Sequence, residues 1–68
     1  ALDPAARFTI DGEALRGETG LTKSQEAVLD LAAVGFTVRR ILDVIPQPDA
    51  EVVEALQSLL DAEILRPA

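Results

Sequence analysis

Apolar residues recur at helical spacing in three successive segments of this 68-residue chain. The segments cover about residues 23–34, a shorter stretch that follows Thr37, and residues 49 to about 62. In each segment the apolar positions fall on one side of a helix and the charged positions on the other, which predicts three amphipathic helices. The expected buried positions are Val28, Leu31 and Ala32 in the first helix, Val38, Ile41, Leu42 and Ile45 in the second, and Val52, Val53, Leu56, Leu59 and Leu60 in the third.

Residues that commonly begin or end helices stand at the edges of these segments. The run Thr22-Lys-Ser-Gln25 has the spacing of a capping box, in which a hydroxyl and an amide side chain satisfy free backbone amides. Thr37 and Asp49 are expected to cap the second and third helices. Gly35 provides a stop after the first helix, and two prolines break the second before the third begins.

Two arrangements remain open for the residues that precede the first of these helices. In one, Asp11-Gly12 forms a two-residue turn between residues 8–10 and 13–15, so that Phe8 faces Leu15 across a hairpin. In the other, residues 13–16 form a single helical turn that ends at Gly17. Residues 1–6 have nothing to anchor them, and we expect a frayed end or a linker there.

Together these elements predict a mainly α fold, namely a trihelical helix-turn-helix or winged-helix-like core with a minimal β element. Residues 1–20 would form an N-terminal linker or short β-hairpin, and residues 21–68 the trihelical winged-helix-like domain. Phe36-Thr37 and Ile64-Leu65-Arg66 occupy the strand positions of such a core. A return strand is missing after them, unless residues 8–10 supply the extra pairing from the N-terminal side.

The composition argues against most kinds of catalytic and metal-binding site. The chain has no His, Cys or Tyr, and Lys23 is its one lysine, so no base can be placed beside an activated nucleophile. The carboxylates at positions 49, 51 and 54 lack the alternating ligands and turn glycine of a calcium loop. Carboxylates on outward helical faces also offer no cleft for acid–base work. We therefore expect a protein that is not an enzyme, with no catalytic residue, no cofactor and no metal.

Charge narrows the classes of partner. Six basic and twelve acidic residues give a formal net charge of −6, which argues against anionic membranes and bulk nucleic acid as partners. No apolar run approaches the roughly 20 residues of a membrane-spanning helix. A cytoplasmic location is the expectation that follows.

The third helix stands where a helix-turn-helix protein places the helix that enters DNA, yet residues 49–63 contain no Lys or Arg. A helix of this charge would be repelled by the phosphate backbone. Its outer face and the adjacent arginines of the second helix supply the candidate partner-binding residues, for which plain solvation is the alternative. These residues are Arg39, Arg40, Glu51, Glu54, Ser58 and Asp61.

The chain resembles the winged-helix-like segment of bacterial PATAN (DUF4388) signalling proteins over about residues 21–66. The resemblance rests on three runs, Leu21-Thr-Lys-Ser-Gln25 through Val28-Leu29, Gly35-Phe-Thr-Val-Arg-Arg-Ile41-Leu, and Pro48-Asp-Ala-Glu-Val-Val with Leu56, Leu59-Leu60 and Ile64-Leu65. It implies a segment that accompanies regulatory domains and acts through protein contacts. Residues 1–20 do not align with the larger domain that precedes the segment in that family. The Gly35-x-Thr-Val-x-x-Ile41 stretch is also similar to the winged-helix peptide-recognition elements of peptide-modifying systems.

These observations lead us to expect a non-enzymatic protein–protein interaction module of a bacterial regulatory or signalling protein, which binds another protein or its own copy. The alternative is a DNA-binding winged-helix transcriptional regulator, in which Lys23, Arg39, Arg40 and Arg66 would carry the phosphate contacts. A second alternative is a peptide-recognition element that adds a strand to the edge of the short sheet.

Overall fold

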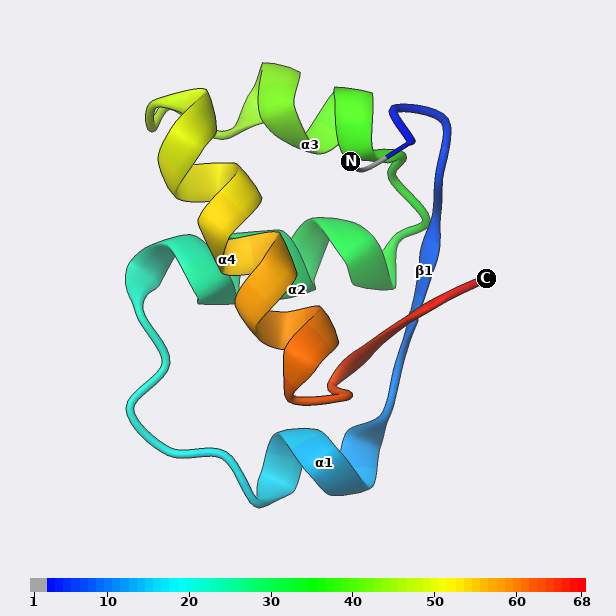
Figure 1. The fold of residues 1–68 in the computed structure, drawn as a ribbon, viewed down its shortest axis with the longest axis vertical. Helices are drawn as coiled ribbons and strands as arrows, with labels where there is room; N and C mark the ends of the chain where they lie inside the picture. Colours follow the sequence, from blue (N-terminus) through cyan, green and yellow to red (C-terminus); the bar gives the residue numbers. More distant parts are fainter. Residues whose placement is uncertain (1–2) are drawn as a thin grey trace.

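Helices follow one another between two three-residue strands in residues 3–68, the part of the chain that the structure, a computed structural model, describes (Figure 1). The fold is mainly helical, with a small two-stranded antiparallel sheet. In chain order the elements are β1 (Phe8–Ile10), α1 (Gly12–Arg16), α2 (Lys23–Ala33), α3 (Val38–Val44), α4 (Asp49–Asp61) and β2 (Leu65–Pro67). The three helices expected between residues 23 and 62 are confirmed as α2, α3 and α4.

Side-chain caps hold the starts of α2 and α3, as the sequence predicts. The Gln25 amide donates to the Thr22 hydroxyl at 3.1 Å, and the Thr22 amide donates to the Gln25 side-chain oxygen at 2.8 Å. Both halves of the capping box are therefore formed. At α3 the Thr37 hydroxyl accepts from the Arg40 amide at 3.3 Å.

The start of α4 differs from the prediction, because Asp49 is not its cap. Pro48 is the N-cap residue and no side chain caps the helix, while Asp49 already belongs to the first turn. The Pro48 carbonyl accepts from the amides of Glu51 and Val52 at 3.0 and 3.2 Å. A cap residue stands just before the helix, whereas Asp49 is its first residue, so its carboxylate is not placed to accept from the amides of Glu51 and Val52. Asp49 and Glu51 still contribute favourable negative charge at the positive end of the helix.

The two longest helices end in the same way. After α2, Gly35 has φ +85°, and the amides of Gly35 and Phe36 donate to the carbonyls of Ala32 and Leu31. This Schellman arrangement confirms Gly35 as the stop. After α4, Glu63 takes the equivalent position with φ 60°, at a cost of about 1 kcal/mol for a residue with a Cβ. The reversal at Glu63 turns the chain into β2.

The hairpin alternative for residues 7–16 is wrong, and the helical alternative is confirmed. Asp11 caps α1 with its side chain, and Gly17 ends it. β1 pairs instead with β2, in the register Phe8↔Pro67, Thr9↔Arg66 and Ile10↔Leu65. The extra pairing from the N-terminal side is therefore formed, and the C-terminal strand lies one residue later than predicted.

Phe36-Thr37 does not form the expected strand. The Phe36 amide is already bonded to the Leu31 carbonyl at 3.2 Å, and Thr37 caps α3. Both residues are thus occupied by the ends of neighbouring helices, which removes the pairing partner that the prediction assigned to β2.

The segment before β1 is held against α3. The amides of Val38 and Arg39 donate to the carbonyls of Ala6 and Pro4, each at 3.0 Å. The expectation of a frayed end is therefore wrong for residues 3–6, because they satisfy amides that a short helix leaves free at its start. Residues 1–2 lie outside the described part of the chain.

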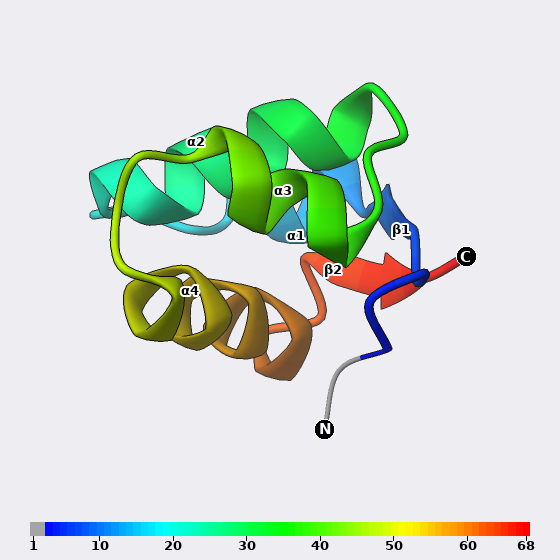
Figure 2. The same ribbon diagram turned by 90° about the horizontal axis from the view of Figure 1, so that it is seen from above.

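The core lies between α4 on one side and α2 and α3 on the other, as Figure 2 shows. Leu56 is 0% exposed and confirms the predicted orientation of α4. Predicted core residues Leu31, Leu42 and Leu60 are only partly buried and pack against the core. Val53 is also only partly buried. The buried residues are Phe8, Val28, Leu29, Ala32, Val38, Ile41, Ile45, Val52, Ala55, Leu56, Leu59, Ile64 and Leu65.

Candidate interaction surface

The outer face of α4 is acidic and exposed over its length. Glu51, Glu54, Ser58 and Asp61 are all exposed, and their spacing of three, four and three residues places them in one stripe. We call this stripe the acidic face. Its four side chains make no hydrogen bond or ion pair with other residues in the range 3–68. The ion pair in that range is formed by Asp11 and Arg66. The acidic face is therefore available to an outside group.

A hollow of about 320 Å³ opens beside the acidic face, between α4 and the first turn of α2. We call it the α2–α4 hollow. One wall comes from α4, with Glu51, Glu54, Ala55 and Ser58. The opposite wall comes from Thr22, Ser24 and Gln25.

The hydrogen bonds of the capping box decide which groups of the hollow remain free. Thr22 and Gln25 are bonded to each other's backbone amides. Ser24, Ser58 and the two glutamates have no side-chain partner among the described residues. The free polar groups are therefore two carboxylates and two hydroxyls, which can accept hydrogen bonds, and the Nε2 group of Gln25, which can donate.

The electrostatic potential of the α2–α4 hollow is set by the start of α2 and by two glutamates of α4. The start of α2 contributes a partial charge equivalent to roughly +0.5 from its aligned peptide dipoles. Glu51 and Glu54 each contribute a full negative charge, and no Lys or Arg lines the hollow. The negative charge exceeds the positive, so the hollow favours a cation over an anion.

Arg39 and Arg40 lie elsewhere. They belong to the first turn of α3, where the Arg40 guanidinium lies 5.5 Å from the centre of the Phe36 ring. Arg39 lines a second, shallow depression with Pro4, Ala5 and Thr37. The six predicted partner-binding residues thus divide into the four of the acidic face and a separate arginine pair.

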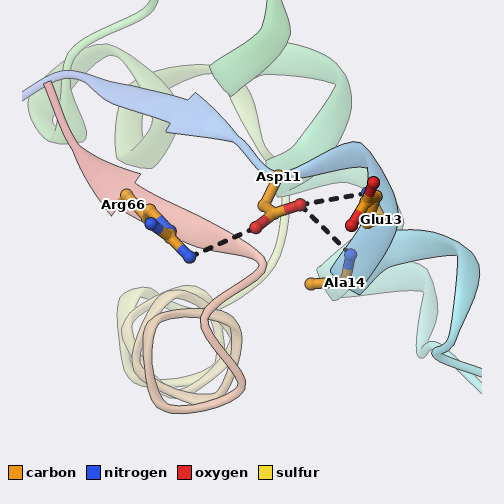
Figure 3. A network of polar contacts seen from close by, with 4 residues as sticks. All are labelled: Asp11, Glu13, Ala14 and Arg66. Carbon is orange, nitrogen blue, oxygen red and sulfur yellow. Dashed lines mark hydrogen bonds and ion pairs between the residues drawn. The ribbon is translucent and has the colours of Figure 1, made fainter.

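Asp11 joins two distant parts of the chain (Figure 3). One of its carboxylate oxygens accepts from the amides of Glu13 and Ala14 at 3.0 and 3.2 Å, which starts α1. The other accepts from the Arg66 guanidinium at 3.2 Å. This pair was not predicted, because the two residues are 55 positions apart. Since both side chains are partly exposed, we assign the pair a modest structural role.

Sequence reasoning missed the wall of the α2–α4 hollow that α2 supplies. The residues 22–25 carry a clear local signal, the capping box, but no signal that they face α4. That placement depends on how α2 and α4 cross, which the pattern of one helix does not contain.

Two searches of the described residues for other sites are negative. Within residues 3–68, no three acidic side chains converge as the ligands of a metal ion would. None of the helices in the same range combines the length and the apolar character needed to cross a bilayer. Comparison of the chain with known protein families, with curated proteins and with solved structures gives no match.

Proposed function

We propose that this chain is a non-enzymatic protein–protein interaction module of a regulatory or signalling protein, and that it binds its partner through the acidic face of α4. The single observation that carries the proposal is the exposed, unpaired stripe of Glu51, Glu54, Ser58 and Asp61. A stripe of this sign suits a basic partner and opposes a phosphate backbone.

The scaffold that we propose is winged-helix-like, and the relationship to PATAN proteins is part of the proposal. Three features support it: the order of α2, α3 and α4, the capped and tight connections between them, and the small sheet that follows α4. In this arrangement β1 would take the place of the strand that a winged helix obtains after its wing.

The distribution of basic residues favours a protein partner over DNA. Lys23 opens α2, whereas Arg39 and Arg40 lie in the first turn of α3, and these two helix starts lie on opposite sides of the molecule (Figures 1 and 2). Arg66 is already paired with Asp11. The residues that would carry phosphate contacts are therefore dispersed, and α4 presents carboxylates where a recognition helix would face DNA.

A charge-reversal experiment tests this assignment. We expect the native chain to bind no duplex DNA in fluorescence anisotropy at any salt concentration between about 50 and 200 mM. The double variant Glu51→Lys/Glu54→Lys is expected to keep its fold and to gain weak, salt-sensitive duplex binding, because surface substitutions usually change stability by about 0.5 kcal/mol or less. Duplex binding by the native chain that weakens steeply with salt would support the DNA-binding alternative instead. A double variant that gains no binding would count against a groove-reading geometry for α4.

A photo-crosslinking experiment tests the protein partner directly. A photoreactive residue at Ser58, in the acidic face, is expected to form a covalent adduct with one distinct protein in cells that carry the chain. The same residue at Glu18, which is exposed near the other end of the chain, serves as the control. Equal adducts from both positions, or none from Ser58, would contradict an interaction through α4.

A further inference from the structure

We propose that the α2–α4 hollow receives the guanidinium of an arginine from a basic segment of the partner protein. This inference rests on the proposed function, since it names the partner chemistry that the acidic face recognises. The binding site then includes residues at the start of α2 as well as the acidic face, and an arginine side chain of the partner enters between the two helices.

The free acceptors of the hollow match the donors of a guanidinium. Arginine presents five N–H donors in a planar fork and accepts no hydrogen bond. Glu51 and Glu54 lie on successive turns of α4, and Ser24 and Ser58 add hydroxyl acceptors on opposite walls. In the capping box the Gln25 side-chain oxygen accepts from the Thr22 amide, so the donor that remains on this side chain is the neutral Nε2 group. A guanidinium outcompetes it for the carboxylates, because hydrogen bonds to an ionised donor are the stronger ones.

The apolar part of the lining suits the aliphatic stem of the same side chain. Ala55 is 5% exposed and follows Glu51 by one turn of α4, and it contributes a methyl group to the lining in place of a longer side chain. Arginine stems commonly pack along apolar surface while the charged head remains with polar groups. An arginine therefore fills the hollow better than a compact cation that has no stem.

A second copy of this chain is a poorer occupant. Each copy carries a formal charge of −6, so two copies repel each other before any local contact forms. Within the arginine pair, the Arg40 guanidinium already lies over the Phe36 ring of its own molecule. A separate protein with a basic segment is attracted by the net charge of −6 that makes two copies repel each other.

The test uses two helical peptides of the same length, with either arginine or lysine at two positions one turn apart. We expect the arginine peptide to shift the backbone NMR signals of Ser24, Gln25, Glu54, Ala55 and Ser58. The double variant Glu51→Gln/Glu54→Gln is expected to weaken its binding about tenfold or more, because charge-assisted hydrogen bonds are lost. The lysine peptide is expected to bind more weakly, because a compact ammonium group lacks the planar fork of five donors with which a guanidinium can bind two carboxylates at once.

The matched control is the double variant Glu13→Gln/Glu18→Gln, which removes the same charge from exposed positions around α1. It is expected to change the affinity by less than about twofold, because neither residue lines the hollow and exposed charges are screened by salt. Circular dichroism checks that both double variants are folded. Equal weakening by the two double variants, equal binding of the two peptides, or signal shifts centred elsewhere would each overturn the inference.

Self-association that the arginine peptide blocks would also overturn it, since the occupant would then be a second copy. Failure of this inference can be distinguished from failure of the proposed function. If crosslinking at Ser58 captures a protein while the arginine peptide does not bind, the interaction module stands and the arginine assignment falls. If neither occurs, both fall.

Discussion

The variant Leu56→Ala is expected to lower the free energy of unfolding by about 2–5 kcal/mol. Leu56 is 0% exposed and lies on the inner face of α4, where that helix packs against α2. Truncation removes the apolar contacts of the side chain and leaves a cavity that such a small core cannot fully close. At about 0.05–0.15 kcal/mol per residue, a 68-residue domain has only about 3–10 kcal/mol of stability in total.

Urea or guanidinium denaturation measures this change. The neighbouring exposed residue provides the control, because Gln57→Ala is expected to alter stability by less than about 0.5 kcal/mol. If Leu56→Ala is too unstable to measure, Leu56→Met keeps the side-chain volume and is expected to cost less than about 1.5 kcal/mol. A Leu56→Ala variant within half a kcal/mol of the native chain would mean that α4 does not present Leu56 to the core.

The orientation of α4 links the stability of the domain to its proposed function. The same helix buries Val52, Leu56 and Leu59 on one side and presents Glu51 and Glu54 on the other. Rotation of α4 would bring the carboxylates towards the core, where an unpaired charge is strongly unfavourable. The burial of Leu56 therefore also fixes the direction of the acidic face, and the stability measurement tests both.

Helices could be predicted from the sequence because their signals are local. The capping box at Thr22 and Gln25, the cap at Thr37 and the left-handed glycine at Gly35 each act within a few residues of the helix that they start or stop. The period of the apolar positions then gave the buried side of α4, with Leu56 at its centre. The acidic face followed from the same period.

Contacts between distant residues could not be predicted in the same way. The Asp11-Gly12 pair fits a hairpin turn as well as a helix start, and the choice depends on β2, which lies more than 50 residues later. Once β2 pairs with β1, Asp11 is free to cap α1 and to bind Arg66. The second wall of the α2–α4 hollow has the same origin, because it depends on how two helices cross.

The variant Phe8→Ala is expected to lower the free energy of unfolding by about 3–5 kcal/mol, which would unfold a large fraction of the molecules. Phe8 is 6% exposed although it belongs to the segment for which a linker was one expectation. It lies opposite Pro67 in the sheet and packs into the core that the three longer helices share. Its ring therefore joins the N-terminal segment to the helices by apolar packing as well as by backbone hydrogen bonds.

Thr9→Ala is the matched control, because Thr9 neighbours Phe8 in β1 but is exposed on the other face of the sheet. Its expected change in stability is less than about 0.5 kcal/mol. Phe8→Leu retains much of the apolar volume and is expected to cost about 1 kcal/mol, which keeps the comparison measurable if Phe8→Ala unfolds. Should Phe8→Ala unfold at nearly the native denaturant concentration, β1 would not belong to the cooperative unit, and residues 21–68 would carry the stability without it.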